Sequence, residues 1–169
     1  METTTQIEQR QLLKRFLSQY YRAKDRQAAL RARLASLQAE LRHPGVKVPP
    51  PDGIPGKTGV SSGAASLTLK IADIEDRIQK QIEIEAKSVI AIMDVIEFLP
   101  ADTIERDILE FRHIDCKPWD KIMDCVHLSR SSCFEYYNKA LDKLLTYKKV
   151  RRILSDYKAR LDREARDTY

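Results

Sequence analysis

Glycine is scarce in this chain and is confined to one stretch. The 169 residues include 5 glycines, all of them between residues 43 and 63, and most of the 7 prolines lie there too. A continuous helix cannot pass through such a composition, so the stretch predicts a break between two structured regions. Charged residues make up 33 % of the chain. High charge with little glycine favours long helices that expose polar faces, and the predicted fold class is all-α.

Two further absences narrow the class of protein. No apolar run reaches the roughly 18 residues that a membrane span needs, and the N-terminal segment lacks the apolar core of a signal peptide. We therefore expect a cytoplasmic protein with no membrane partner. The 3 cysteines are odd in number and form no CxxC pair, which indicates a reducing compartment without a disulfide framework.

The sequence also lacks the patterns of metal sites and enzymes. His113, Cys116, Cys125, His127 and Cys133 match no structural zinc spacing, so neither a metal nor a cofactor is predicted. The segment GIPGKTGVSSG contains a GKT triplet, but Pro51 stands where a phosphate-binding loop needs its first glycine. No nucleophile and base are paired by their spacing, and we expect no enzyme.

The most informative stretch is KPWDKIMDCVHLSRSSCFEYYNKALDKLL, residues 117–145. Pro118 suits the first turn of a helix, and the apolar residues that follow have helical spacing: Trp119, Ile122, Met123 and Val126. His127 and Leu128 form the predicted turn, and Ser129 is a suitable N-cap for a second helix. The inner face of that helix would carry Cys133, Tyr136, Ala140, Leu141 and Leu144. The pattern predicts a helix-turn-helix whose second helix presents polar side chains to DNA bases.

A second interpretation of the same stretch stays open. Any pair of packed helices shows apolar periodicity on both members, and many such pairs bind nothing. His127 also stands where the turn usually has glycine.

Two long helices are predicted before this stretch. Residues 7–42 carry a heptad-like seam, composed of Leu13, Phe16, Tyr20, Ala23, Gln27, Leu30, Leu34, Leu37 and Leu41. Residues 66–99 carry an apolar stripe, composed of Ile71, Ile74, Ile78, Ile82, Ala86, Val89, Met93 and Ile96. We expect an antiparallel pair that needs further apolar cover, because a lone helix of this kind is marginal in water.

Charge divides the chain into three regions. The net charge is +5, but residues 10–47 and 129–152 are strongly basic, whereas residues 73–110 are acidic. Either the first and middle helices pair by charge, or the basic surfaces meet nucleic acid.

The remaining segments complete a predicted C-terminal domain. Residues 101–113 read as a short helix with Asp102 as its N-cap, and residues after Leu145 as a basic C-terminal helix. The predicted domains are an interaction region at 1–100, with its break at 43–63, and a DNA-binding domain at 101–169. The expected architecture is two long antiparallel helices, a three-helix helix-turn-helix unit and a C-terminal helix.

Several short motifs carry a resemblance to a known family. They are Leu109-x-x-Arg112-His113-Ile114-Asp115, Pro118-Trp119-x-x-Ile122, Leu128-Ser129-Arg130-Ser131-Ser132 and Asn138-Lys139-Ala140-Leu141-x-x-Leu144. Residues 104–145 thereby resemble the C-terminal half of phage late transcription regulators of the ArpU/RinA-like type, a unit similar to region 4 of bacterial sigma factors. Phe134 departs from the pattern, because sigma factors often carry a basic residue there. The resemblance implies double-stranded DNA as a partner, RNA polymerase as a possible one, and activation of late genes in a bacterial host.

The expected site follows from these positions. Base contacts are assigned to Arg130, Ser131, Ser132 and Glu135. Phosphate contacts are assigned to Lys117, Lys139, Lys143, Lys148, Lys149, Arg151 and Arg152. The predicted domain core is Trp119, Ile122, Val126, Cys133, Leu141 and Leu144.

Assembly and two rival functions complete the expectations. The unbroken apolar stripes predict a homodimer joined mainly through residues 7–99, with Ile84, Ile90 and Ile92 widening the surface. The first rival is a sigma-like factor that acts through polymerase with weak DNA binding of its own. The second is a helical DNA-recognition protein of the small-terminase type.

Overall fold

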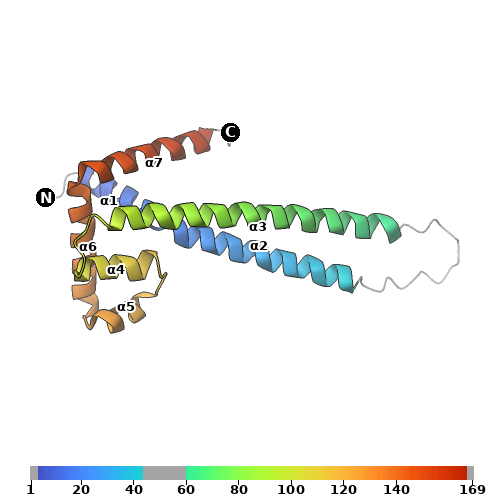
Figure 1. Cartoon of the computed structure of the whole chain (residues 1–169), viewed down its shortest axis with the longest axis horizontal. Helices are drawn as coiled ribbons and strands as arrows, with labels where there is room; N and C mark the ends of the chain where they lie inside the picture. The colour runs from blue at the N-terminus through green and yellow to red at the C-terminus, as the bar shows by residue number, and fades with distance from the viewer. Residues whose placement is uncertain (1–3, 44–59, 167–169) are drawn as a thin grey trace. The chain divides into compact units, whose positions relative to one another are not determined.

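The computed structural model describes residues 4–43 and 60–166, and within these ranges every regular element is an α-helix (Figure 1). The seven helices are α1 (Thr4–Leu17), α2 (Gln19–Arg42), α3 (Val60–Ile96), α4 (Ile104–His113), α5 (Trp119–Val126), α6 (Arg130–Thr146) and α7 (Lys148–Arg166). The predicted all-α class is confirmed for the described residues. None of these helices is both long and apolar enough to cross a lipid bilayer. Most of the predicted break, with the GKT triplet, lies outside the described residues.

The helices form two compact units. The first unit comprises the described residues of Met1–Arg22 and Glu85–Tyr169, and the second those of Ala23–Ile84. The N-terminal helix α1 and the last part of α3 thus belong with α4 to α7. The boundary predicted at residue 100 would have placed them in the other domain. The sequence did not predict this grouping, because the residues that share the core are far apart along the chain.

The predicted single helix at 7–42 is interrupted at Ser18. The guanidinium of Arg22 donates to the carbonyl oxygens of Arg15 (2.5 Å) and Ser18 (3.4 Å). At Arg15 the side chain takes the place of a backbone N–H, which is a recognised cause of a local break, whereas the Ser18 carbonyl still accepts the backbone N–H of Arg22 (3.2 Å). The interruption separates α1 from α2 five residues before the second unit begins at Ala23.

One apolar core holds the first unit together. Its buried members come from all the helices of the unit except α2: Leu13, Phe16, Leu17, Ile92, Val95, Ile96, Leu99, Ile108, Leu109, Ile122, Cys133, Tyr137, Ala140, Leu141, Leu144, Val150, Leu154 and Tyr157. Each large aliphatic side chain of this kind stabilises the fold by about 1.5–3 kcal/mol when it leaves water. The core fixes how α6 is oriented, because α6 packs against α1, α4 and α7.

The buried face of α3 differs from the predicted stripe in its second half. Ile71, Ile74 and Ile78 are half-buried as expected, but the face then continues through Gln81, Glu85 and Ser88 to Ile92, Val95 and Leu99. Ile82 and Met93 are exposed, at 36 % and 43 %. The structural seam keeps alternating steps of three and four, the period of packed helices. The predicted stripe instead took two steps of four after Ile78, to Ile82 and Ala86. Each step of four advances slightly more than one turn, so the stripe moved away from the buried seam.

The start of α4 also differs from its prediction. The N-cap residue is Thr103, whose backbone is extended, and not Asp102, which has a positive φ of 59°. The Thr103 hydroxyl donates to the carbonyl oxygen of Pro100 (2.9 Å) and makes no cap bond to α4. Glu105, in the first turn of α4, is buried, and its carboxylate accepts a hydrogen bond from Lys143 of α6.

The second unit buries few of its own apolar side chains. Within it, Ala23 is the one apolar residue classed as buried among those described, and Gln81 is buried beside it. The Gln81 amide donates to the carbonyl oxygen of Ala23 (3.1 Å) and joins α3 to α2. The larger apolar residues along the seam stay half-buried: Leu30, Leu34, Leu37, Leu67, Ile71, Ile74 and Ile78.

The place of α1 in the first core gives a test. Leu13 is fully buried, so Leu13→Ala should lower the free energy of unfolding of the first unit by about 2–5 kcal/mol. Chemical denaturation followed by the fluorescence of Trp119, the single tryptophan, measures this unit directly. Ile7→Ala is the matched control, because Ile7 lies on the same helix and is 43 % exposed. An unchanged Trp119 transition in Leu13→Ala would show that α1 is not part of this core.

Candidate nucleic-acid interface

Helices α5 and α6 are joined by a tight connection of three residues. His127 follows α5 in the left-handed conformation (φ 53°, ψ 40°), and its N–H donates to the carbonyl of Met123. Leu128 continues the turn, and its N–H reaches the same carbonyl at 3.3 Å. Ser129 caps α6 as predicted, because its hydroxyl oxygen accepts the N–H of Ser132 (3.2 Å). The histidine thus adopts the backbone conformation for which glycine is usually chosen.

The inner face of α6 differs from the predicted one by a single residue. Cys133, Ala140, Leu141 and Leu144 are buried as expected, but the buried tyrosine is Tyr137 and not Tyr136. Tyr136 is half-buried, with the Lys139 ammonium 5.7 Å from the centre of its ring. Steps of four from Cys133 to Tyr137 and Leu141 follow the helix more closely than a step to residue 136.

Trp119 lies at the edge of the core. It and Val126 are half-buried against the core, whereas Ile122 is fully buried. The Trp119 ring lies 4.4 Å from that of Phe134 and 5.2 Å from that of Tyr137, centre to centre. The Arg112 guanidinium sits 5.2 Å from the centre of the tryptophan ring. Trp119 therefore links α5 to α6 through aromatic contacts, which stabilise beyond simple burial.

The residues assigned to base contacts cluster at the first turns of α6. Arg130, Ser131 and Glu135 are exposed there. Ser132 is half-buried, and its hydroxyl lies 3.0 Å from that of Ser129, so it is engaged in the cap. The Arg130 guanidinium lies 5.8 Å from the centre of the Phe134 ring. Three polar side chains thus project together from the N-terminal end of a helix whose opposite face is locked in the core.

Two of the lysines assigned to phosphate contacts are paired within the protein. Lys143 donates to a carboxylate oxygen of Glu105 at 2.8 Å, and the Lys139 ammonium lies 3.6 Å from the same oxygen. The Glu105 side chain is 9 % exposed. The hydrogen bond from Lys143 lowers the pKa of this carboxyl below its usual value, so Glu105 remains charged. Part of the positive charge of α6 is therefore neutralised by α4.

The other assigned cations differ in their surroundings. Lys148, Lys149, Arg151 and Arg152 are exposed at the start of α7, around the buried Val150. The Lys149 ammonium lies 5.7 Å from the Phe98 ring centre, and Arg151 donates to the carbonyl of Leu145 (3.0 Å). Lys117 is half-buried, 3.8 Å from the centre of the Phe111 ring and 3.4 Å from a carboxylate oxygen of Asp115.

Sequence reasoning missed a buried polar pair beneath α6. The Nε2 of His113 lies 3.1 Å from the hydroxyl oxygen of Tyr137, and both residues are buried. Burial lowers the pKa of His113 to about 4 and raises that of Tyr137 to about 12. His113 also has a hydrogen bond to the backbone of Leu17, so it connects α4 to both α1 and α6. The Arg112-His113 motif was visible, but nothing in the spacing indicated a tyrosine 24 residues later as its partner.

A second missed contact joins α1 to α6. Arg10 makes a bidentate ion pair with Asp142, through its Nε and Nη2 atoms. Paired guanidinium and carboxylate groups of this geometry are the strongest of the ordinary ion pairs. The contact fixes the C-terminal half of α6 to α1 and leaves Arg130 and Glu135, in the N-terminal half, uninvolved.

The cysteine and histidine side chains do not gather. Cys116 is half-buried, Cys125 exposed and Cys133 buried. Within residues 6–43 and 63–166, no group of three His, Cys, Asp or Glu side chains is arranged to hold a metal ion.

Comparison of the chain with protein-family models, with curated proteins and with solved structures gave no match.

The buried His113 predicts a pH-dependent stability. A histidine whose folded pKa is about 4, against 6.5 when unfolded, stabilises fully above pH 6.5, and this contribution is lost as the pH falls towards 4. Between pH 6.5 and about pH 4.5 the free energy of unfolding should drop by about 2 kcal/mol. Denaturation at each pH, followed by Trp119 fluorescence, measures the drop.

The control for this prediction is His113→Gln, which offers Tyr137 a hydrogen bond but does not titrate. Its stability should change little over the same interval. Glu105 does not account for the drop. Its pKa is lowered from 4.5, so most of its contribution to the free energy of unfolding is lost below that pH, and it is the same in both proteins. Equal slopes for the two proteins would contradict the assignment to His113.

Proposed function

We propose that this protein is a sequence-specific DNA-binding transcription regulator that reads DNA with α6. The observation that carries the proposal is the exposed group Arg130, Ser131 and Glu135 at the N-terminal end of α6. A helix-turn-helix places this end of its second helix in the major groove. The buried inner face and the Ser129 cap support the proposal, because they hold the group on a rigid element.

Each residue of the group has a chemical role. The Arg130 guanidinium can donate two hydrogen bonds to guanine O6 and N7, and the Glu135 carboxylate can accept from cytosine N4. Ser131 can donate or accept at either kind of base pair. Ser132 is the weakest member of the expected set, because its hydroxyl is engaged with Ser129.

Phosphate contacts fall chiefly to the start of α7. Lys148, Lys149, Arg151 and Arg152 are exposed together, next to the end of α6. Lys139 and Lys143 would have to share their charge between Glu105 and DNA. Lys117, beside Asp115, is in a similar position. Such contacts position the protein without reading sequence.

The resemblance to ArpU/RinA-like phage regulators supports the finer parts of the proposal. They are a helix-turn-helix similar to sigma factor region 4, an antiparallel pairing of the long helices, activation of late genes in a bacterial cell, and contact with RNA polymerase. The hydrogen bond from Gln81 to Ala23 favours the antiparallel pairing, because it joins the early part of α2 to the later part of α3.

Selection of duplexes from a random-sequence library with the purified protein tests the proposal and supplies a target. Arg130→Ala and Glu135→Ala should each weaken binding to the selected duplex by about 1–3 kcal/mol. Lys148→Ala should weaken the selected and an unrelated duplex alike, because phosphates carry no sequence information. Arg31→Ala, an exposed change in the second unit, is the control and should alter neither affinity. Failure to enrich any sequence would refute the proposed function.

The proposal includes a homodimer, because one reading helix makes few base contacts and two copies raise affinity through effective concentration. Not every residue of the expected joining surface is exposed. Ile92 and Ile96 lie in the core of the first unit and are not available to a second copy. The exposed apolar residues Ile82, Ala86, Ile90 and Met93 lie along one side of α3 and support a symmetric contact.

Solution mass at low micromolar concentration, by light scattering or sedimentation, tests this surface. Full-length protein should have the mass of a dimer, and Ile90→Asp should give monomers, because a carboxylate would enter the apolar contact. Ile84→Asp is the control. Ile84 is on the same helix and 48 % exposed but lies on the opposite side from the stripe, so the dimer should persist. A monomeric wild type, or equal loss in both variants, would contradict the surface.

A further inference from the structure

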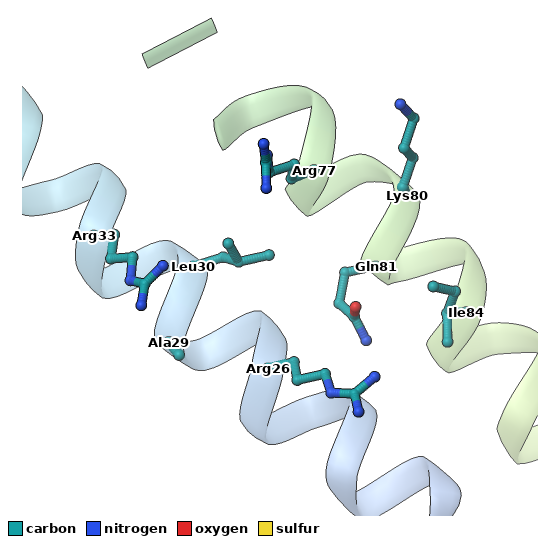
Figure 2. A pocket seen from close by; sticks show the side chains of 8 residues that line it. All are labelled: Arg26, Ala29, Leu30, Arg33, Arg77, Lys80, Gln81 and Ile84. Carbon is teal, nitrogen blue, oxygen red and sulfur yellow. The ribbon is translucent and has the colours of Figure 1, made fainter. Parts of the chain in front are cut away.

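The second unit contains a groove between α2 and α3 that the proposed function does not use. Its lining comes from two turns of each helix: Arg26, Ala29, Leu30 and Arg33 from α2, and Arg77, Lys80, Gln81 and Ile84 from α3. Figure 2 shows Leu30 and Gln81 directed into the space between the helices, with Arg26, Arg33 and Arg77 around it. The floor is therefore largely apolar, and cations stand on both rims.

The positive charges on the rims are only partly neutralised by neighbouring carboxylates. Arg77 pairs with Asp73 (2.9 Å) and Lys80 with Asp76 (2.7 Å), each four residues earlier on the same helix. All four of these side chains are well exposed, so the pairs contribute little stability. Arg26 and Arg33 have no ion pair with any described residue. The groove consequently presents a surplus of positive charge.

The second unit also needs apolar cover. Leu30, Ile74 and Ile78 are only half-buried, and Ala23 is the one buried apolar residue among those described in this unit. Two helices with so little buried apolar surface are marginal in water. A third helix laid along the groove would cover Leu30 and Ile84 and complete a small bundle.

A symmetric contact between two copies of this groove is unfavourable. A symmetric contact would set the four cations of one groove against the same four of its partner, and like charges at an interface are repulsive. Duplex DNA does not account for the floor, because phosphates offer no apolar surface to Leu30 and Ile84. The occupant must combine apolar side chains with carboxylates on both sides.

We propose that this groove binds an acidic amphipathic helix of another protein. The helix lies along α2 and α3, with its apolar side chains on Ala29, Leu30 and Ile84. Its carboxylates meet Arg26 and Arg33 on one rim, and Arg77 and Lys80 on the other. Arg26 and Arg33 are seven residues apart, or about 10 Å along α2, which matches carboxylates two turns apart on the bound helix. Helix-in-groove recognition of this kind takes its affinity from the apolar contacts and its selectivity from the charges.

The test uses the full chain and a labelled synthetic peptide about three heptads long, with leucine at the core positions and glutamate elsewhere. Fluorescence anisotropy at an ionic strength of about 0.15 M, where the Debye length is about 8 Å, measures binding. Arg33→Glu with Arg77→Glu, which reverses one charge on each rim, should weaken binding at least about tenfold. The same variant should gain affinity for a peptide with lysine in place of glutamate. Replacing the leucines by serine should abolish binding to the wild type, because the floor is apolar.

The matched control is Arg31→Glu with Lys87→Glu. Both residues are exposed, one on each helix, and neither lines the groove, so the change in net charge is the same. This variant should bind the acidic peptide within about twofold of the wild type, because salt screens charges outside the groove. Circular dichroism confirms that each variant retains its helices.

Four results would overturn the proposal. They are no binding of the acidic peptide by the wild type, equal loss in the groove and control variants, undiminished binding of the serine peptide, and selective loss of affinity for an unrelated DNA duplex in the groove variant. The last would assign the groove to DNA. DNA recognition by α6 is measured separately with Arg130→Ala, so the failure of one proposal does not imply failure of the other.

Discussion

Burial of the inner face of α6 is the constraint on which the rest of the first unit depends. Cys133, Tyr137, Leu141 and Leu144 leave water only because α1, α4 and α7 close around them. Once that face is fixed, the rotation of α6 about its own axis is fixed as well. Arg130 and Glu135 are exposed because they lie on the side of α6 opposite the buried face that contains Cys133 and Tyr137. The outward chemistry of α6 is thus set by apolar packing on its other side.

Polar contacts add direction to this packing. Glu105 draws Lys143 and Lys139 towards α4, Arg10 holds Asp142 from α1, and the His113–Tyr137 pair lies between them in the core. Apolar contact alone tolerates small rotations and slides of a helix. Hydrogen bonds to the buried Glu105 and His113 do not, because a displaced partner leaves a buried polar group unsatisfied. These two contacts therefore make one orientation of α6 more favourable than its neighbours, and the exposed Arg10–Asp142 pair adds to them.

The sequence predicted what is decided locally. Helix α5, the turn at His127 and the Ser129 cap follow from spacing and capping chemistry over a few residues, and so does the exposure of Arg130 and Glu135. At the break near Ser18 the Arg22 side chain bonds the carbonyl of Arg15, a contact that helical periodicity does not predict. The path of the α3 seam through Gln81 and Ser88 was missed because polar residues were assumed to lie outside it. Likewise, no local pattern could join Leu13 to core residues that begin 79 positions later, at Ile92.

The turns of the first unit have a consequence for engineering. Asp102, Cys116 and His127 all have positive φ, and each stands in a connection next to α4, α5 or α6. A left-handed backbone costs a residue with a side chain about 1–2 kcal/mol, a strain that glycine escapes. The described connections of this unit contain no glycine. Glycine at these three positions would relieve the strain without disturbing a core contact, so the connections of this unit are places where its stability can be raised.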